Sequence, residues 1–214
     1  MYSAISVAVL GFLLGVRHAV DPDHVVAVGT IATRSPSFRR AAAVGALWGI
    51  GHTVTIVGVG GTIVLLRVAI SPRVGLAMEF AVALMLIVLG LLNVANARHE
   101  HPPEPSSARP VVVGMVHGLA GSAAIALLVL ATVSSAQWAI AYLVLFGAGT
   151  IAGMVMVTAI IAVPASLAVT RVRSARRWLT LASGVASLAF GVFLASELTA
   201  DGNSPPEAPA SAPR

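Results

Sequence analysis

Six long apolar runs set the limits on how this chain can fold. They span roughly residues 3–33, 41–66, 74–97, 110–132, 138–164 and 178–198. A helix needs about 20 apolar residues to cross the hydrocarbon core of a bilayer. Of all residues 57% are hydrophobic and only 10% are charged, against about 25% charged in a soluble domain. We therefore predict an all-α, multi-pass membrane protein with six transmembrane helices.

The sequence outside these runs leaves no room for a separate soluble domain. The loops are short, so we predict one membrane domain over residues 1–199. The tail, residues 200–214, is rich in Pro, Ala, Ser and acidic residues and is expected to be disordered. No basic stripe with interleaved aromatic residues is present, so nucleic acid is not an expected partner. Cysteine is absent, which excludes disulfides and thiolate metal sites.

Arginines gather in alternate loops, and this pattern predicts the orientation of the chain. The first, third and fifth loops carry Arg34, Arg39, Arg40, Arg98, Arg109, Arg171, Arg173, Arg176 and Arg177. The second and fourth loops carry only Arg67 and Arg73. Cytoplasmic loops of membrane proteins carry an excess of Lys and Arg. We therefore place the odd-numbered loops in the cytoplasm and both termini on the outer side of the plasma (inner) membrane.

The two halves of the chain share a sequence pattern. Gly15-Val16-Arg17-His18 aligns with Gly114-Met115-Val116-His117, and Leu47-Trp48-Gly49 aligns with Leu145-Phe146-Gly147. In the third helices Gly90 aligns with Gly191. Each half has three helices, so the second half enters the membrane from the opposite face. We predict two inverted repeats, residues 1–97 and 110–199, with the site at their interface, as in transporters built this way. The alternative is chance similarity between helices rich in Gly and Ala.

A cluster of ionisable residues interrupts the first apolar run: Arg17, His18, Asp21, Asp23 and His24, with Pro22 among them. Such a residue costs about 2.5–3.5 kcal/mol at the centre of a bilayer, which makes the cluster a candidate functional site. On a straight helix His18 and His24 would point in different directions. Pro22 breaks the helix, and Asp21 suits the N-cap of the next one. The alternative is a proline kink whose polar groups only satisfy one another.

Imidazole and carboxylate together suit divalent first-row metals such as Ni, Co or Zn. We expect the unwound turn to direct His18, Asp23 and His24 to one metal ion. His52, within Gly51-His52-Thr53, is expected to bind or line the path of the ion, or else to be a hydrogen-bonded packing residue. His117 is the repeat counterpart of His18 and is expected to face the same site.

Other polar residues, near this cluster and elsewhere in the chain, have expected roles of their own. Ser122 stands where Asp23 stands in the first half, so the predicted site is asymmetric. Arg17 either neutralises the carboxylates or lines an outer vestibule. His99 and His101 belong to a polar loop that either collects metal or is simply flexible. Asn93 and Asn96 are expected at the polar end of a helix.

These motifs resemble the nickel/cobalt transporter (NiCoT) family. The family signature, His-x4-Asp-His in a membrane helix, matches His18, Asp23 and His24, and a second signature, Gly-His-Ser/Thr, matches Gly51-His52-Thr53. The family's later Leu-Gly-Phe-Asp-Thr-type motif is not present, and six helices are counted where eight are usual. The resemblance is therefore to the shorter, urease-accessory-like branch. It implies Ni²⁺ or Co²⁺ as substrate and urease or hydrogenase metal-delivery proteins as candidate partners.

The sequence thus predicts a secondary transporter that takes up Ni²⁺ or Co²⁺ by alternating access. No Walker A motif is present, so this chain is not expected to bind ATP. An intramembrane metalloenzyme or haem protein is a rival of a different class, but no His-Glu-x-x-His motif occurs and six histidines are too few for a di-iron hydroxylase. We expect neither an enzyme nor a tightly bound cofactor. Metal efflux and metal delivery without transport are the alternatives. The glycines at 58, 60 and 61 fit helix packing within one chain or within a homo-oligomer.

Overall fold

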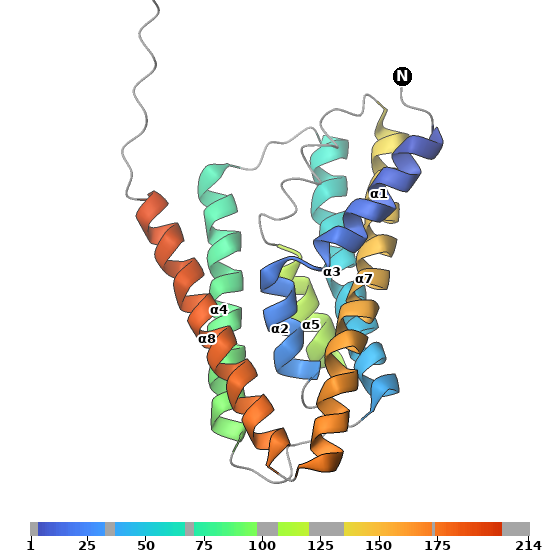
Figure 1. Ribbon diagram of the computed structural model, residues 1–214. Helices are drawn as coiled ribbons and strands as arrows, with labels where there is room; N and C mark the ends of the chain where they lie inside the picture. Colours follow the sequence, from blue (N-terminus) through green and yellow to red (C-terminus); the bar gives the residue numbers. More distant parts are fainter. Residues whose placement is uncertain are drawn as a thin grey trace, which may run out of the picture.

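The computed structural model describes residues 4–32, 37–66, 71–97, 107–119, 135–172 and 174–202. This part of the chain is helical and contains no strand. The helices are α1 (Ala4–His18), α2 (Pro22–Ala32), α3 (Phe38–Leu66), α4 (Pro72–Asn96), α5 (Ala108–His117), α7 (Ala136–Arg171) and α8 (Ala175–Gly202). Helices α1, α2, α4 and α7 run one way through the bundle, and α3, α5 and α8 run the other way (Figure 1).

Four of these helices are long and apolar enough to cross a bilayer: α3, α4, α7 and residues 175–200 of α8. Large apolar side chains also cover the outside of the bundle. Leu13, Leu65 and Ile160 are 57%, 66% and 62% exposed, as suits contact with lipid rather than water. The chain is a multi-pass membrane protein, as the sequence predicts.

The boundaries of the fifth run and of the tail differ from the sequence prediction. The fifth run is helical from Ala136 to Arg171 and continues through Pro164, where the predicted segment ends. Proline is tolerated inside membrane helices because neighbouring groups satisfy the freed backbone. Helix α8 includes residues 200–202 of the expected tail, and the remainder of the tail lies outside the described residues. The fourth run is described only as far as residue 119.

The predicted break in the first run lies at about mid-height in the bundle (Figure 1). Helix α1 ends at His18 and α2 begins at Pro22. Between them the Asp21 N–H donates to the His18 carbonyl (3.1 Å), and the Asp21 carbonyl accepts the first bond of α2, from the Val25 N–H (3.1 Å). Asp21 thus occupies the N-cap position and Pro22 the first helical position, where a missing N–H costs nothing.

Helix α1 packs against α7 much as α5 packs against α3. A Cβ added to Gly15 in α1 would fall on the carbonyl oxygen of Phe146 in α7. A Cβ added to Gly114 in α5 would fall on the carbonyl oxygen of Trp48 in α3. These two glycines align in the sequence, as do the two aromatic residues. Both helix pairs therefore approach to backbone contact at corresponding places, which requires small residues.

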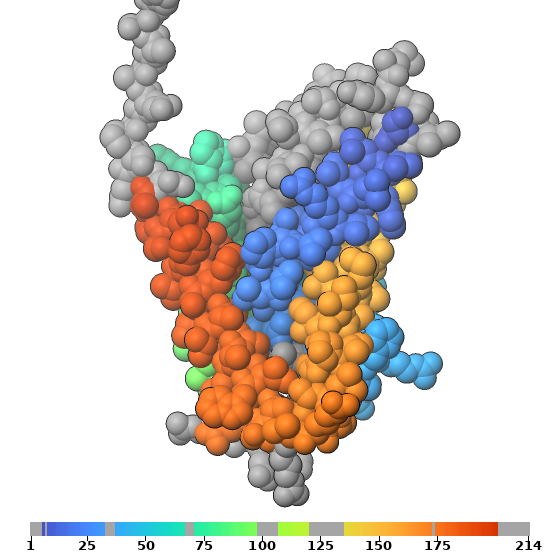
Figure 2. Space-filling model, in the orientation of Figure 1, coloured from blue at the N-terminus to red at the C-terminus, as the bar shows by residue number. Residues whose placement is uncertain are grey.

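Further glycine contacts follow the same correspondence. A Cβ on Gly149 would meet the Phe12 carbonyl, and a Cβ on Gly51 would meet the Val111 carbonyl. Helices α4 and α8 form a third close pair, with Gly90 against Gly184 and Gly191 against Ala83. On one face of the molecule α1 and α2, in blue, lie between α7 and α8 (Figure 2). The break between α1 and α2 therefore lies inside a tightly packed frame.

Candidate metal centre

The break brings four histidines and one aspartate together in the bundle. His18 is the last residue of α1, and Asp23 and His24 lie in the first turn of α2. His52 lies within α3, and His117 is the last residue of α5. All five residues were predicted as metal ligands, and the structure places them in one cluster. We call this set the histidine centre.

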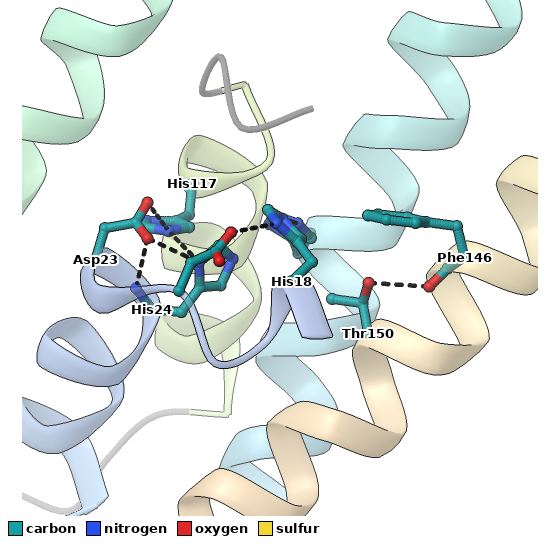
Figure 3. Close-up of polar contacts among 8 residues, drawn as sticks. His18, Asp23, His24, His117, Phe146 and Thr150 are labelled. Carbon is teal, nitrogen blue, oxygen red and sulfur yellow. Dashed lines mark hydrogen bonds and ion pairs between the residues drawn. The ribbon is translucent and has the colours of Figure 1, made fainter. Parts of the chain in front are cut away.

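The imidazole rings of the histidine centre lie close together, and Figure 3 shows those of His18, His24 and His117. The Nε2 atoms of His18 and His52 are 3.1 Å apart. The ring of His24 lies between the others, with centroids 4.4 Å from His18, 5.0 Å from His52 and 4.2 Å from His117. The exposed fraction of these four residues is between 0 and 6%. Four imidazoles in such a space have little access to water.

Two carboxylates orient the rings. Asp21 Oδ2 accepts a 2.8 Å hydrogen bond from His18 Nδ1. Asp23 Oδ1 lies 3.1 Å from His24 Nδ1, and Asp23 Oδ2 lies 3.1 Å from His117 Nε2. At His18, the Asp21 carboxylate fixes the proton on Nδ1 and leaves the lone pair of Nε2 available for a metal ion. This is the usual arrangement of a metal-binding histidine.

Three ring nitrogens of the centre are buried and have no hydrogen-bond partner within the described part of the chain. They are His24 Nε2, His52 Nδ1 and His117 Nδ1. A buried polar atom without a partner is costly and is rare in folded proteins. A metal ion is one partner that a buried imidazole nitrogen can take. Two groups are compact enough to hold a metal ion: His18, His24 and His52, and Asp23, His24 and His117.

The remaining predicted residues lie around the centre or outside the described part. Pro22 begins α2, and Gly51 provides the close contact with α5. The Thr53 hydroxyl donates to the Gly147 carbonyl (3.2 Å) and so joins α3 to α7. Arg17 is exposed and forms no ion pair among the described residues, so it does not neutralise the carboxylates directly. Ser122, His99 and His101 lie outside the described residues.

Two aromatic residues beside the centre were not among the predicted site residues. The ring of Phe146 lies 5.3 Å from that of His18, and the ring of Trp48 lies 5.7 Å from that of His117. Trp48 and Phe146 align in the sequence, as do His117 and His18. Each half of the chain thus places an aromatic ring over the histidine of the other half. The repeat alignment already paired Trp48 with Phe146, because each of them directly precedes an aligned glycine.

Fold and site together define a class: a multi-pass helical membrane protein with a buried histidine–carboxylate centre at a helix break. A family model described as NicO, high-affinity nickel-transport protein, matches residues 4–99. The urease accessory protein UreH of Bacillus sp. (strain TB-90) is 36% identical over 205 residues, which cover 88% of this chain and 90% of the relative. The chain therefore belongs to the high-affinity nickel-transport protein family, in its urease-accessory-like branch. No solved structure matches it.

The comparisons confirm the resemblance drawn from the sequence motifs. The family comprises transport and accessory proteins and not enzymes, in agreement with the sequence prediction. The match at residues 4–99 includes α1 to α4 and therefore His18, Asp23, His24 and His52. The relative's alignment is long enough to reach into both halves of the chain.

Proposed function

We propose that this chain is a secondary permease that carries Ni²⁺ or Co²⁺ across the plasma (inner) membrane, in the direction of uptake, by alternating access. The observation that carries the proposal is the set of three unpartnered, buried ring nitrogens beside two carboxylates. These are borderline nitrogen and hard oxygen donors, which suit divalent first-row metals. Ionisable residues at membrane depth mark ion pathways, because their burial is otherwise too costly.

In this proposal His18, Asp23, His24, His52 and His117 are the ligands of the transported ion. Asp21 does not bind the ion itself. Its carboxylate holds the Nδ1 proton of His18 and so leaves the lone pair of Nε2 for the ion. Thr150 stands where His52 stands in the first half, and its hydroxyl donates to the Phe146 carbonyl (2.9 Å) of its own helix (Figure 3). The second half thus supplies fewer ligands, and the proposed site is asymmetric.

The proposed architecture is six transmembrane segments in two inverted repeats, residues 1–97 and 110–199, forming one membrane domain. The corresponding glycine contacts of α1 with α7 and of α5 with α3 support it. The opposite directions of α1 and α5 support it as well (Figure 1). In inverted-repeat transporters the halves rock against each other about a site near the midplane, which is where the break between α1 and α2 lies.

We propose that both termini lie outside the cytoplasm. Helix α1 begins and α8 ends at the same end of the bundle (Figure 1). Arg39 and Arg40 of α3 and Arg171 of α7 lie at the opposite end, which the positive-inside rule assigns to the cytoplasm. A negative interior favours cation entry by about 2.3 kcal/mol per charge per 100 mV, which is why we propose uptake.

A second candidate is metal delivery to urease maturation without transport, which the printed name of the 36%-identical relative favours. Reconstitution of the purified chain in liposomes with an enclosed Ni²⁺-sensitive dye separates the two. A permease raises the dye signal when Ni²⁺ is added outside, and His18→Ala abolishes the rise. Empty liposomes provide the background. A wild-type signal equal to that background, with correctly inserted protein, would reject the permease.

A further inference from the structure

The histidine centre contains two overlapping groups of candidate ligands. Two atoms that bind the same metal ion lie at most about 4.2 Å apart, since a metal–nitrogen bond is about 2.1 Å long. The ligand atoms of each three-residue group lie within 4.8 Å of one another, and no group includes all five residues. Small side-chain movements would close either group on an ion. Both groups contain His24, which lies between His18 and His117 (Figure 3).

We propose that the transported ion has two alternative positions that share His24, and that it passes from one to the other during transport. The first position is ligated by His18, His24 and His52, and the second by Asp23, His24 and His117. This inference rests on the proposed permease function and adds a path within its site.

The shared histidine makes the two positions exclusive. A neutral imidazole has a proton on one ring nitrogen and a lone pair on the other, so it binds one metal ion at a time. His24 is surrounded by the other three rings and by Asp23, at 3.1 Å from its Nδ1. It has no second lone pair with which to bind another ion. The chain therefore holds one ion, and His24 remains a ligand as the ion changes position.

The two positions differ in charge. The first has three neutral imidazoles, and the second has the Asp23 carboxylate in place of one of them. A divalent cation in a low-dielectric interior is attracted far more strongly by a carboxylate than by neutral dipoles. The first position is linked through His18 to Asp21, whose side chain is 41% exposed. Asp23, a ligand of the second position, is itself 18% exposed, so a carboxylate with access to the surface of the bundle lies beside each position.

The two positions also differ in the helices that form them. The first is formed by α1, α2 and α3, which all belong to the first half of the chain. The second joins α2 to His117 at the end of α5, in the second half. Helix α1 packs chiefly against α7, and α3 packs against α7 and α5, so helices of the second half hold the ligands of both positions. Passage of the ion from the first position to the second therefore moves it from ligands on α1 and α3 to ligands that include His117 of α5, while His24 of α2 stays bound.

The test is a Co²⁺ titration of the purified full-length chain in lipid nanodiscs, followed by visible absorption, which reports the donors around bound Co²⁺. His52→Gln removes only the first position, His117→Gln only the second, and His24→Ala both. The Gln variants keep most of the side-chain volume so that folding is preserved. Asn93→Ala, which removes a buried side chain bonded to Thr30 and Ser183, is the control for loss of a buried polar group.

We expect one Co²⁺ per wild-type chain, and one per chain in each Gln variant with affinity lowered by about 10–100-fold. The two Gln variants should give different spectra, because one retains three imidazoles and the other retains a carboxylate. His24→Ala should not bind Co²⁺, and both Gln variants should lose at least about tenfold in liposome flux, in line with the loss of affinity.

Identical spectra for the two Gln variants, two ions per wild-type chain, or wild-type flux in either variant would overturn the two-position path and leave the permease standing. A wild-type chain that binds no Co²⁺ and gives no flux would overturn the permease function itself. The two failures are therefore distinguishable in the same set of measurements.

Discussion

Asp21 Oδ2 lies 2.8 Å from Nδ1 of His18, and this bond connects a partly exposed carboxylate to a buried ring. The other nitrogen of the same ring, Nε2, faces His52 Nε2 at 3.1 Å. Asp21 therefore sets which nitrogen of His18 has a free lone pair. Outer partners of this kind determine metal affinity without touching the ion.

Replacement of Asp21 should weaken metal binding without removing a ligand. Asp21→Asn keeps an acceptor for His18 but loses the charge, and Asp21→Ala loses both, so the affinity for Ni²⁺ should fall in the order wild type, Asn, Ala. The loss should reach about 10–100-fold in the Ala variant. Isothermal titration of the purified chain measures it, with Glu79→Gln as a carboxylate control elsewhere in the bundle. Equal affinity in wild type and Asp21→Ala would refute this role.

The close contacts of Gly15 and Gly114 should tolerate no side chain. Gly15→Ala and Gly114→Ala each place a methyl group on a backbone carbonyl of the neighbouring helix, so the helices must separate. Overpacking of this kind costs about 1–3 kcal/mol. Gly58→Ala is the matched control, because nothing lies within 4 Å of its added Cβ. There alanine should be neutral or stabilising by up to about 1 kcal/mol. Thermal unfolding in detergent compares the three variants, and equal stability would contradict the close packing.

The sequence predicted the parts of this site that depend on local chemistry. The break at Pro22 follows from a missing N–H, and the cluster of His18, Asp23 and His24 follows from the cost of burying such groups. The sequence did not predict which residues of distant helices lie in contact. The repeat alignment pairs Trp48 with Phe146, but it does not show that the ring of Trp48 lies beside His117, because that contact depends on how closely Gly114 lets α5 approach α3.

Asn93 is a second residue whose contacts with other helices could not be predicted from the sequence. The sequence predicts Asn93 at the polar end of a helix, and it lies in the last turn of α4. Asn93 is nevertheless buried there, and its Nδ2 donates to the Thr30 carbonyl of α2 (2.9 Å) and to Ser183 of α8 (3.2 Å). An amide near a helix end has the same sequence signature whether it faces water or a neighbouring helix. Only the packing of α2 and α8 against α4 distinguishes the two.

Asn93→Ala should therefore destabilise the bundle, and Asn96→Ala should not. Asn93 bonds to two other helices, whereas Asn96 is half-buried and, within the described part of the chain, donates to the Leu92 carbonyl of its own helix (2.7 Å). Hydrogen bonds between membrane helices contribute about 0.6 kcal/mol on average and at most about 1.7 kcal/mol. The free energy of unfolding in mixed micelles should fall by an amount in this range for Asn93→Ala alone. An equal loss in both variants would show that Asn93 does not join the helices.

Metal uptake should fall as the external pH falls. Histidine ordinarily gains its proton between about pH 5 and 8, and a protonated imidazole has no lone pair for a metal ion, so protons compete with Ni²⁺ for the centre. The sign follows directly: lower pH gives fewer neutral rings, weaker binding and slower flux at a fixed Ni²⁺ concentration. The liposome assay measures initial rates across this range, with an added Ni²⁺ ionophore to correct for the pH response of the dye. Saturating Ni²⁺ should restore the rate at low pH if competition is the cause, and a rate that stays low at saturation would point instead to a structural effect of protonation.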